Sequence, residues 1–598
     1  MDYTILYLLT APFIFSVILS LSLTPAVKRI AVQYGKVARP KADRWHKTPT
    51  ALFGGVAIYL TVITASVLFI TPTDKFLGIL AGGTFLFAFG IIDDLKPLKP
   101  YTKLIAQIAA AVIAIFFNVK IELFTPLIAL PLTVLWIVAV TNAFNLLDNM
   151  DGLSAGIAFI TATALAVLSA LQGRWELGAV SFIIAGAALG FLKYNFSPAS
   201  IFMGDCGSMF LGFTIGALSI AGTYQHASHF IVTMAVPVLV MAIPIFDTTF
   251  VTIMRNLTGR SISQGGKDHS SHRLVILGLS EKKAVLMLYS LSIITGTIAI
   301  IYPLSNIYMI TVIGILVLIG LFFLGVFLSE ARVYSKEEME LAKEKVLGKN
   351  NTTVLNTTIF YKRQIVEVIV DFLLITVAYI SAYLLRFEGV IVKENLRLIT
   401  QSLPVLIAVQ LGAFYYFGLY KKIWKYIGLS DVISILKAVT LGTVTTVIIL
   451  MLTTRFFGYS RAVFIIYWLM LVVLATSARG LLRMLREHFA EIQKTEGERV
   501  LIYGAGDGGN VLLREIKNNP ELQYNVIGFI DDDPTKTGRK IYGMSVLGTG
   551  AELPNIAKKK NIQKVLIAIS KLSDEDFQRI MNLCSENALP CKKMGKML

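Results

Sequence analysis

Long apolar runs follow one another along most of this chain, and each is long enough to cross a lipid bilayer. A transmembrane helix needs roughly 20 apolar residues, and the sequence contains about fifteen such runs. The composition agrees, since 55% of the 598 residues are hydrophobic and the mean hydropathy is +0.69. Uninterrupted apolar stretches of this length are typical of membrane proteins rather than soluble ones. The sequence therefore predicts a polytopic α-helical membrane protein.

The apolar runs form two blocks, separated and followed by polar sequence. Residues 1–330 hold about eleven expected helices, residues 331–364 are a charged cytoplasmic linker, and residues 365–484 hold four more helices. The first run has no small-residue cleavage site, so we expect an anchor rather than a cleaved signal peptide. The expected helices are 3–24, 52–71, 75–92, 101–118, 122–140, 154–171, 177–194, 209–222, 230–252, 284–302, 307–328, 365–386, 401–419, 434–454 and 461–483.

Residues 485–598 have the composition of a soluble α/β domain. Strand-like segments such as RVLIY and KVLIAIS alternate with amphipathic helical segments, which predicts a parallel sheet. We therefore expect a C-terminal, cytoplasmic, Rossmann-like domain after the membrane helices.

The polar loops between the apolar runs are expected on one side of the membrane. The loop 25–51 is rich in lysine and arginine, so the positive-inside rule makes it cytoplasmic. Alternation then places the loops 93–101, 141–153, 195–208 and 253–283 on the same side, whereas the opposite connections are short and nearly uncharged. Every loop with chemically useful side chains therefore faces the cytoplasm.

One of these loops, NAFNLLDNMDGLSAG over residues 142–156, carries carboxylates and carboxamides between two apolar runs. Such groups are costly in hydrocarbon, so the loop must lie in a wet cavity or at the membrane surface. Asn145, Asp148 and Asp151 are spaced by three, which on a helical turn puts them on one face. Hard oxygen ligands of this kind suit Mg²⁺ or Mn²⁺ with phosphates as co-ligands. A plain polar loop that ends in Asp-Gly is the alternative.

Two further loops also have both a functional and a structural explanation. Asp93 and Asp94, followed by Lys103, can position a metal, a lysine or a proton, or can cap the next helix. Asn195 and Asp205 belong to the segment YNFSPASIFMGDCGS, in which Gly204 and Gly207 allow backbone to approach a ligand closely or only form a tight turn.

The remaining polar loops are basic. The segment 255–273 combines several cations with His269 and His272, which suits a pyrophosphate. Two histidines three apart can also bind zinc, but no third ligand is close in sequence. Arg44 and His46 lie in a basic segment that can contact substrate or can merely follow the positive-inside rule.

Taken together, these loops resemble the polyprenyl-phosphate N-acetylhexosamine-1-phosphate transferases, the superfamily that contains the phospho-MurNAc-pentapeptide transferase. The matching stretches, which cover roughly residues 25–280, are FGIIDDLKPLKPYTKLIAQ, NAFNLLDNMDGLSAG, FLKYNFSPASIFMGDCGSMFLG, PIFDT and GKDHSSHRL. Within the superfamily, LDNMDGL and HSSHR resemble the branch that starts O-antigen, teichoic-acid or related glycans. The peptidoglycan branch usually has Gly in place of Asn149 and a longer histidine run.

The resemblance implies that undecaprenyl phosphate attacks the β-phosphorus of a UDP-N-acetylhexosamine, with UDP-GlcNAc as the expected one, and that UMP is released. It also implies roles for individual residues. The catalytic residues are expected to be Asp93, Asp94, Lys103, Asp148, Asp151 and His269. The ligands of Mg²⁺ or Mn²⁺ are expected to be Asp205, Asn145 and Asp148. The substrate-binding residues are expected to be Asn195, Lys103, His272, Arg273, Arg44 and His46.

The role of Asp93 or Asp94 stays open between base, nucleophile and positioning group. A phosphate monoester has a second pKa near about 6, so the lipid phosphate is mostly dianionic at neutral pH. A strong base is then hardly needed, and Asp93 either removes the remaining proton or holds Lys103 in place.

The C-terminal domain carries the pattern of a dinucleotide site. Gly504, Gly506 and Gly509 follow a strand and open a helix, and Asp531 lies at the end of the next strand. Four helices followed by this domain resemble the N-terminal part of membrane nucleotide-sugar dehydratases and epimerases and of another class of polyprenyl glycosylphosphotransferases. No Tyr-x-x-x-Lys pair follows Glu498, so we expect a nucleotide-binding or regulatory module, with a nucleotide or NAD(P) as its ligand, or a fold that binds nothing.

Charge and cysteine content limit the remaining partners. The net charge of +17 fits basic cytoplasmic loops, anionic lipids and phosphorylated substrates, and no nucleic-acid partner is expected. The three cysteines give neither a disulfide framework nor metal spacing. We expect a multi-pass protein of a bacterial or archaeal inner membrane, and leave a homo-oligomer open. A nucleotide-sugar oxidoreductase and a lipid-linked sugar transporter are the alternative functions.

Overall fold

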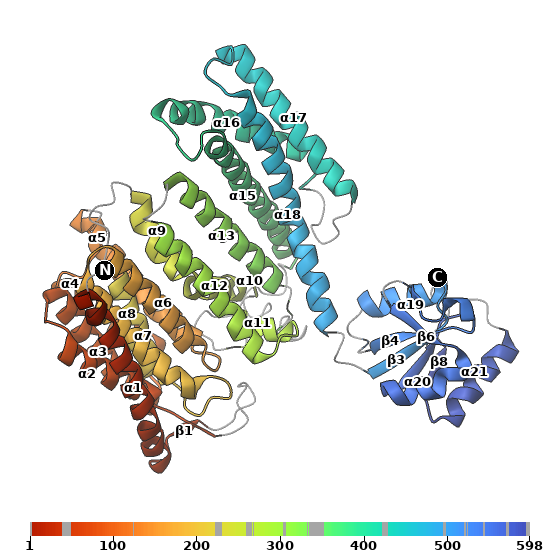
Figure 1. Cartoon of the computed structure of the whole chain (residues 1–598), viewed down its shortest axis with the longest axis horizontal. Coiled ribbons are helices and arrows are strands. Elements are labelled where there is room, and N and C mark those ends of the chain that lie inside the picture. The colour runs from red at the N-terminus through yellow and green to blue at the C-terminus, as the bar shows by residue number, and fades with distance from the viewer. Residues whose placement is uncertain are drawn as a thin grey trace. The chain divides into compact units, whose positions relative to one another are not determined.

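The computed structural model describes the chain except for short segments. The described residues are all those outside 1–2, 39–48, 123–124, 222–229, 259–265, 267, 303–306, 330, 332, 334–351, 421–428, 494–497, 519–521, 523, 542–543, 570–572 and 594–598. The chain divides into two compact units, Met1–Met484 and Leu485–Leu598, and Figure 1 labels their elements.

The first unit is almost entirely helical. Its first helices are α1 (Tyr3–Gln33), α2 (Gly54–Phe69), α3 (Asp74–Leu95), α4 (Pro100–Phe116), α5 (Pro126–Leu147), α6 (Leu153–Leu171), α7 (Trp175–Asn195) and α8 (Gly204–Ala221). Next come α9 (Phe230–Val240), α10 (Ala242–Thr258), α11 (Ser270–Ile276), α12 (Glu281–Ile301) and α13 (Ile307–Leu328). Its last helices are α15 (Thr352–Arg386), α16 (Lys393–Tyr416), α17 (Leu429–Thr454) and α18 (Arg461–Gln493).

Twelve helices in the described part of the chain are long and apolar enough to cross a membrane, and two shorter apolar helices are α2 and α4. The polytopic helical class predicted from the sequence is confirmed, whereas the expected total of about fifteen is not. This is a multi-pass membrane protein. The proposed division of the first unit at residues 330 and 364 stays a prediction.

Most predicted boundaries are close to the observed ones, and the differences have local causes. The helix expected over 230–252 is interrupted at Met241, because Pro244 near the start of α10 has no N–H to donate to the Val240 carbonyl four residues earlier. The helix expected over 209–222 begins at Gly204, and the helix expected to end at 140 continues to Leu147. These two extensions matter because they bring polar residues onto the ends of α5 and α8.

Helix α8 lies at the centre of the first bundle. All its residues from Cys206 to Ala221 are buried, and α2, α3, α5, α6 and α7 pack around it. Glycines allow the closest approaches: a Cβ on Gly55 would collide with Gly207 of α8, and one on Gly90 would collide with Cys206. The N-terminus of α8 is therefore held tightly between α2 and α3.

A short β-pair supports the same end of α8. Strands β1 (Val37–Ala38) and β2 (Thr50–Ala51) pair in antiparallel fashion. Ala51 forms a bridge with Ile201, and the Gly54 N–H donates to the Phe202 carbonyl at 2.9 Å. The backbone just before α8 is thus fixed on both sides.

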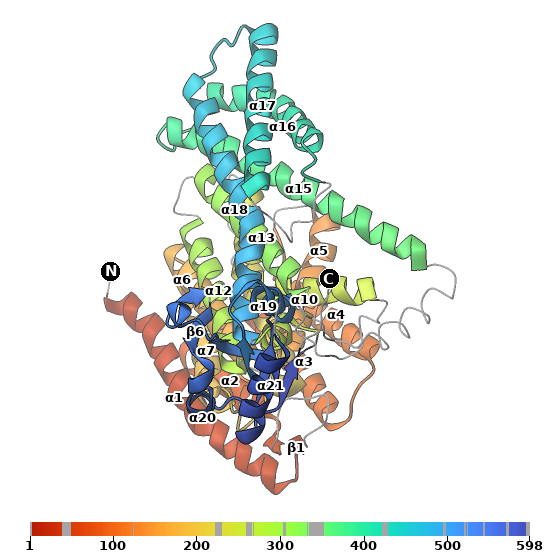
Figure 2. The same ribbon diagram turned by 90° about the vertical axis from the view of Figure 1, so that its right-hand side faces the viewer.

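The helices α15 to α18 form a second group, which Figure 2 shows from the side. Helix α16 packs against α15 and α17, and α13 packs against α15. Inside this group Arg479 of α18 makes two hydrogen bonds, of 3.1 and 2.8 Å, to the carboxylate of Asp371 of α15. Both side chains are buried, so each charge is compensated by the other.

The second unit is a six-stranded sheet with the order β5-β6-β4-β3-β7-β8. All neighbours pair in parallel except β5 and β6. The strands are β3 (Glu498–Tyr503), β4 (Tyr524–Ile530), β5 (Lys540–Ile541), β6 (Met544–Gly548), β7 (Lys564–Ile567) and β8 (Cys591–Lys593). The helices are α19 (Asp507–Asn518), α20 (Leu553–Lys560) and α21 (Asp574–Glu586).

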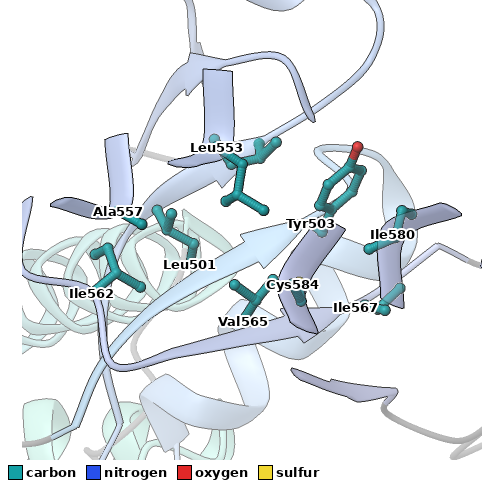
Figure 3. Packing of buried hydrophobic residues seen from close by; sticks show 10 residues of the cluster. Leu501, Tyr503, Leu553, Ala557, Ile562, Val565, Ile567, Ile580 and Cys584 are labelled. Atoms are coloured by element: carbon teal, nitrogen blue, oxygen red, sulfur yellow. The ribbon is translucent and has the colours of Figure 1, made fainter. Parts of the chain in front are cut away.

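Alternate strand residues form two cores on the two faces of this sheet. On one face Val500 and Ile502 pack with Leu512 and Ile516 of α19. On the other face Leu501 and its neighbours pack with α20 and α21, as Figure 3 shows. Helices on both faces of a parallel sheet define the doubly wound α/β architecture, so the predicted fold class of the C-terminal domain is confirmed.

Candidate active site

Lys103 of α4 joins two carboxylates that are far apart in the sequence. Its ammonium group forms ion pairs with Asp93 of α3 and with Asp205 of α8, the latter at 2.6 Å. Asp93 also accepts the Leu98 N–H at 2.5 Å. Asp93 is buried, whereas the side chains of Lys103 and Asp205 are 26% and 32% exposed. The lysine is therefore held by buried protein but can be reached by a ligand.

Asn145 at the end of α5 completes this group. Its side-chain N–H₂ donates to Asp205 at 2.8 Å and to Ser208 at 2.9 Å. Asp93, Lys103, Asn145 and Asp205 therefore form one cluster, named here the Lys103 cluster. It gathers the C-terminal ends of α3 and α5 and the N-terminal ends of α4 and α8, as alternation of membrane helices requires.

Asp148 follows α5 directly and lies beside the cluster. Burial, and after it the neighbouring carboxylates of Asp205, Asp94 and Asp151, raises the pKa of Asp148 to about 8. This carboxyl therefore carries a proton at pH 7 unless a cation compensates its charge.

The expected single helical face of Asn145, Asp148 and Asp151 is wrong. Helix α5 ends at Leu147, and Asp148 is its C-cap residue. Gly152, with a φ of 78°, then redirects the chain into α6. Asp151 therefore lies outside α5, and it accepts the Ala199 N–H at 2.8 Å.

Asn195, like Asp151, connects the loop after α5 with the segment before α8. Its amide oxygen accepts the Gly152 N–H at 3.1 Å, and its N–H₂ donates to the Ile201 carbonyl at 2.9 Å. Asn195 is buried. Asp151 and Asn195 thus tie the loop after α5 to the segment before α8, and their expected contact with nucleotide stays a prediction.

Asp94 caps α8 from another helix. One carboxylate oxygen accepts the Asp205 N–H at 2.8 Å, and the other accepts the Cys206 N–H at 3.0 Å. These are unpaired donors of the first turn of α8, and a carboxylate there also interacts favourably with the helix dipole. The side chain expected in catalysis is therefore occupied in holding the helix that carries Asp205.

The segment 268–273 is fixed by a second set of polar contacts. The Arg255 guanidinium makes two hydrogen bonds to Asp268, of 2.7 and 2.9 Å. Burial alone would raise the pKa of Asp268, but the hydrogen bonds and charge of Arg255 outweigh it and lower that pKa. Ser271 donates to Asn149 at 2.7 Å, which joins this segment to the loop after α5.

Arg273 faces the protein interior. Its guanidinium donates to the carbonyls of Asp268, Leu328 and Ala331 at 3.0, 3.1 and 3.0 Å. It also lies over the ring of Phe250 at 5.3 Å. In this structure Arg273 anchors the segment to the end of α13, and its expected role in binding phosphate stays a prediction.

His269 and His272 are both buried, with ring centroids 6.0 Å apart. The Nδ1 of His269 lies 2.8 Å from the carboxylate of Asp247 on α10. Arg44 and His46 lie outside the described residues.

Two sets of residues were not assigned from the sequence. Asp247 is a lone acid in the apolar segment PIFDT, and that isolation is the signal that could have identified it. Gln107 of α4 and Asn142 of α5 exchange amide hydrogen bonds of 3.1 and 2.7 Å. This pair joins the two helices next to the Lys103 cluster.

The donors around Asp205 fit a hard cation. Asp205 and Asp148 offer carboxylate oxygens and Asn145 an amide oxygen, which are ligand types that Mg²⁺ prefers. Within the described ranges no three His, Cys, Asp or Glu residues form a ready metal cage. Mg²⁺ needs only one or two protein carboxylates when substrate phosphates supply further oxygens.

The Gly-rich turn of the second unit has the expected geometry. Gly504 has a φ of 109°, a Cβ on Gly509 would collide with the Gly504 carbonyl, and Gly506 faces open space. Asp531 accepts the Ala505 N–H at 2.7 Å and pairs with Lys536 at 3.1 Å. In this structure Asp531 therefore binds the turn itself.

Comparison with known proteins decides the family. Residues 76–223 match the family model of glycosyl transferase family 4. A Bacillus subtilis protein named "Probable undecaprenyl-phosphate N-acetylglucosaminyl 1-phosphate transferase" is 37% identical over 309 residues, which cover 50% of this chain and 86% of the relative. The chain belongs to glycosyl transferase family 4. The resemblance inferred from the sequence motifs is confirmed.

Other relatives of this family 4 protein cover a similar share of the chain. A decaprenyl-phosphate N-acetylglucosaminephosphotransferase of Mycolicibacterium smegmatis is 34% identical over 302 residues, covering 44% of this chain and 74% of the relative. A phospho-N-acetylmuramoyl-pentapeptide-transferase of Staphylococcus aureus is 29% identical over 307 residues, covering 46% and 92%. Residues 416–591 match a separate model, that of a CoA-binding domain, so a second module is fused to the family 4 half.

Proposed function

We infer that this chain transfers N-acetylglucosamine-1-phosphate from UDP-N-acetylglucosamine to a polyprenyl phosphate such as undecaprenyl phosphate. The observation that carries this inference is the Lys103 cluster at the ends of apolar helices, with Asp148 beside it. A cation held by two carboxylates, next to spare carboxylate and amide oxygens, suits a reaction between phosphate groups.

The reaction balances without a redox partner. A phosphate oxygen of the lipid attacks the β-phosphorus of the nucleotide sugar, and a new P–O–P bond forms. The bond between the β-phosphorus and the oxygen bridging to the α-phosphate breaks, and this oxygen leaves with UMP. Because the lipid phosphate is mostly dianionic above about pH 6, no strong base is required.

Each residue of the site has its own role in this reaction. Lys103 donates to phosphate oxygens, and Asp93 holds its ammonium group in place. Asp205, with Asn145 and Asp148, is the place for Mg²⁺ or Mn²⁺, which when bound supplies charge neutralisation to the diphosphate. Asp94 keeps Asp205 at the first turn of α8, and His269 contacts phosphate from the segment 268–273.

The site faces the cytoplasm in this proposal. The basic loop 25–51 sets that orientation, and the nucleotide sugar is a cytoplasmic substrate. We place the chain in a bacterial or archaeal inner membrane, where its product starts a cell-surface glycan.

We also propose that the C-terminal unit binds a nucleotide at the turn from Gly504 to Gly509. The open space at Gly506 and the parallel strand order support this, since ligands of doubly wound sheets bind at the carboxyl ends of the strands. Isothermal titration of the full chain with CoA, NAD⁺ and ATP tests the proposal. The proposal is supported if one of these ligands gives binding heat with the original chain but not with Gly506→Val. It is refuted if none of the three ligands binds.

Incubation of the purified protein with labelled UDP-N-acetylglucosamine, undecaprenyl phosphate and Mg²⁺ tests the transferase. Butanol-soluble label and an equal amount of UMP are expected, and both should disappear when the lipid phosphate is omitted. UMP without labelled lipid would indicate hydrolysis. Neither product, with protein shown to be folded, would refute the function.

A further inference from the structure

Asp247 is a buried carboxylate that the proposed reaction does not yet use. It lies on α10 and is 1% exposed. One oxygen lies 2.8 Å from Nδ1 of His269. The other accepts the Ser270 N–H at 2.8 Å and the Ser270 hydroxyl at 2.5 Å. A buried carboxylate is costly unless it is paired and hydrogen-bonded, and here both oxygens are engaged.

This contact determines the protonation pattern of the imidazole ring. An ionised carboxylate only accepts hydrogen bonds, so Nδ1 of His269 must carry the proton. The other ring nitrogen, Nε2, then has either a lone pair or, in the imidazolium, a second N–H. In the imidazolium form the positive charge lies beside the Asp247 carboxylate, and Nε2–H can donate to an anion.

The ring cannot easily adopt another orientation, because its backbone is anchored on both sides. Asp268, just before His269, is held by two hydrogen bonds from Arg255. Ser270, just after it, is held by Asp247. Ser271 reaches Asn149, the neighbour of Asp148 in the candidate active site. His269 therefore belongs to a fixed segment that contacts the loop of the site.

We propose that Asp247 is a positioning residue for His269, and that it holds the ring so that Nε2–H donates to a phosphate oxygen of the substrates. This inference rests on the proposed transferase function, because the phosphate is that of the lipid acceptor or of the nucleotide sugar. Asp247 itself does not touch the substrate.

Asp247→Asn is the informative variant. The amide oxygen still accepts from Ser270, but the amide N–H₂ can only donate to Nδ1, so the ring can no longer carry a proton on both nitrogens. Nε2 keeps its N–H in the remaining tautomer, but the donor that faces the phosphate has lost its positive charge. We expect kcat/KM to fall about 10- to 100-fold, as for other residues that orient a functional histidine. Ser270→Ala removes one hydrogen bond to Asp247 and leaves the His269 contact, so it is the matched control and should keep activity within about twofold of the original chain.

A double-mutant cycle separates positioning from a structural role. His269→Ala should reduce kcat/KM at least as much as Asp247→Asn, and the double variant should be no worse than His269→Ala alone. If the two losses multiply, Asp247 acts independently of His269 and the inference is wrong. Equal thermal unfolding of all variants in detergent excludes misfolding as the cause. If Asp247→Asn unfolds, Asp247→Glu replaces it in the same cycle, since it keeps the carboxylate but moves it.

The outcome distinguishes this inference from the proposed function. An original chain that makes no lipid-linked sugar refutes the function and with it this role for His269. An active original chain with a fully active Asp247→Asn variant refutes only the role of Asp247.

Discussion

Two charged groups of the first unit differ in how their charges are compensated. The Asp371–Arg479 pair is closed, with two hydrogen bonds between one donor group and one acceptor group, and its side chains are 0% and 4% exposed. In the Lys103 cluster a single ammonium group is shared by Asp93 and Asp205 and remains 26% exposed. A closed pair stabilises packing, whereas a shared and accessible cation can exchange one partner for a ligand.

The surroundings of the two groups differ in the same direction. Arg479 also donates to the Ala475 carbonyl at 3.3 Å and lies over the ring of Phe414, at 5.7 Å, so packed protein surrounds its guanidinium. The Lys103 cluster includes the amide of Asn145 and is bordered by Asp148 and the capped end of α8, which supply further polar atoms. The comparison indicates that burial of charge alone does not mark an active site. An active site is indicated instead by a charged side chain that a ligand can reach and that has further polar groups beside it without a paired charge.

The largest effect is expected when the closed pair is broken. Arg479→Met leaves Asp371 buried without its cation, which should destabilise the helical group by about 3–5 kcal/mol. Thermal or denaturant-induced unfolding in detergent measures the loss, and Arg461→Met, at the exposed start of the same helix, is the matched control. Activity per folded molecule should stay unchanged. A strong loss of activity at unchanged stability would mean that this pair, too, has a catalytic role.

For Lys103, the shared cation, we expect a large loss of activity and a smaller loss of stability. Lys103→Met should lower kcat/KM about 10²- to 10³-fold, because the phosphate oxygens lose a positioned charge. Stability should also fall, because the buried Asp93 loses its cation, but less than in Arg479→Met, since Asp205 is partly exposed and Asp93 keeps the Leu98 N–H. Lys99→Met, one turn earlier and exposed, is the control and should keep its activity. If Lys103→Met lowered the stability but not kcat/KM, Lys103 would have a structural role like that of Arg479.

A smaller effect is expected for the carboxylate that holds this lysine. Asp93→Asn keeps an acceptor for the Leu98 N–H but loses the charge that orients Lys103. If Asp93 only positions Lys103, activity should fall about 10- to 100-fold by the same factor at pH 6.5 and at pH 8.5. If Asp93 is a base, the loss should be greater at pH 6.5, where more of the lipid phosphate is protonated. Rates at both pH values, relative to the original chain, decide between these roles.

The sequence was informative where periodicity and polarity act locally. Apolar runs predicted most helices, and the polar loops predicted that Asp93, Lys103, Asn145 and Asp205 belong together. The positions of these residues at helix ends follow from alternation across the membrane. The Gly-rich turn and the alternating strand and helix segments likewise predicted the α/β fold of the C-terminal unit.

The sequence was less informative where contacts between distant segments decide. Spacing suggested that Asp151 shares a helical face with Asp148, but the end of α5 at Leu147 separates them. Nothing near Arg273 in the sequence predicts that its guanidinium binds carbonyls of Leu328 and Ala331. The pairing of Asp247 with His269 likewise depends on how α10 and α11 pack, which no local pattern encodes.

The smallest effect is expected for Asp94. It differs from both the closed pair and the shared cation, because its carboxylate accepts backbone N–H groups rather than pairing with a charged side chain. Asp94→Ala removes both acceptors of the first turn of α8 and should cost about 0.5–2 kcal/mol of stability, as for other helix caps. Asp94→Asn keeps one oxygen acceptor, so it should lose less stability and retain more activity than Asp94→Ala. Unfolding and kcat/KM measured on both variants test this order. Equal and complete loss of activity in both, at full stability, would show that the charge of Asp94 acts in the reaction and that capping α8 is only its secondary role.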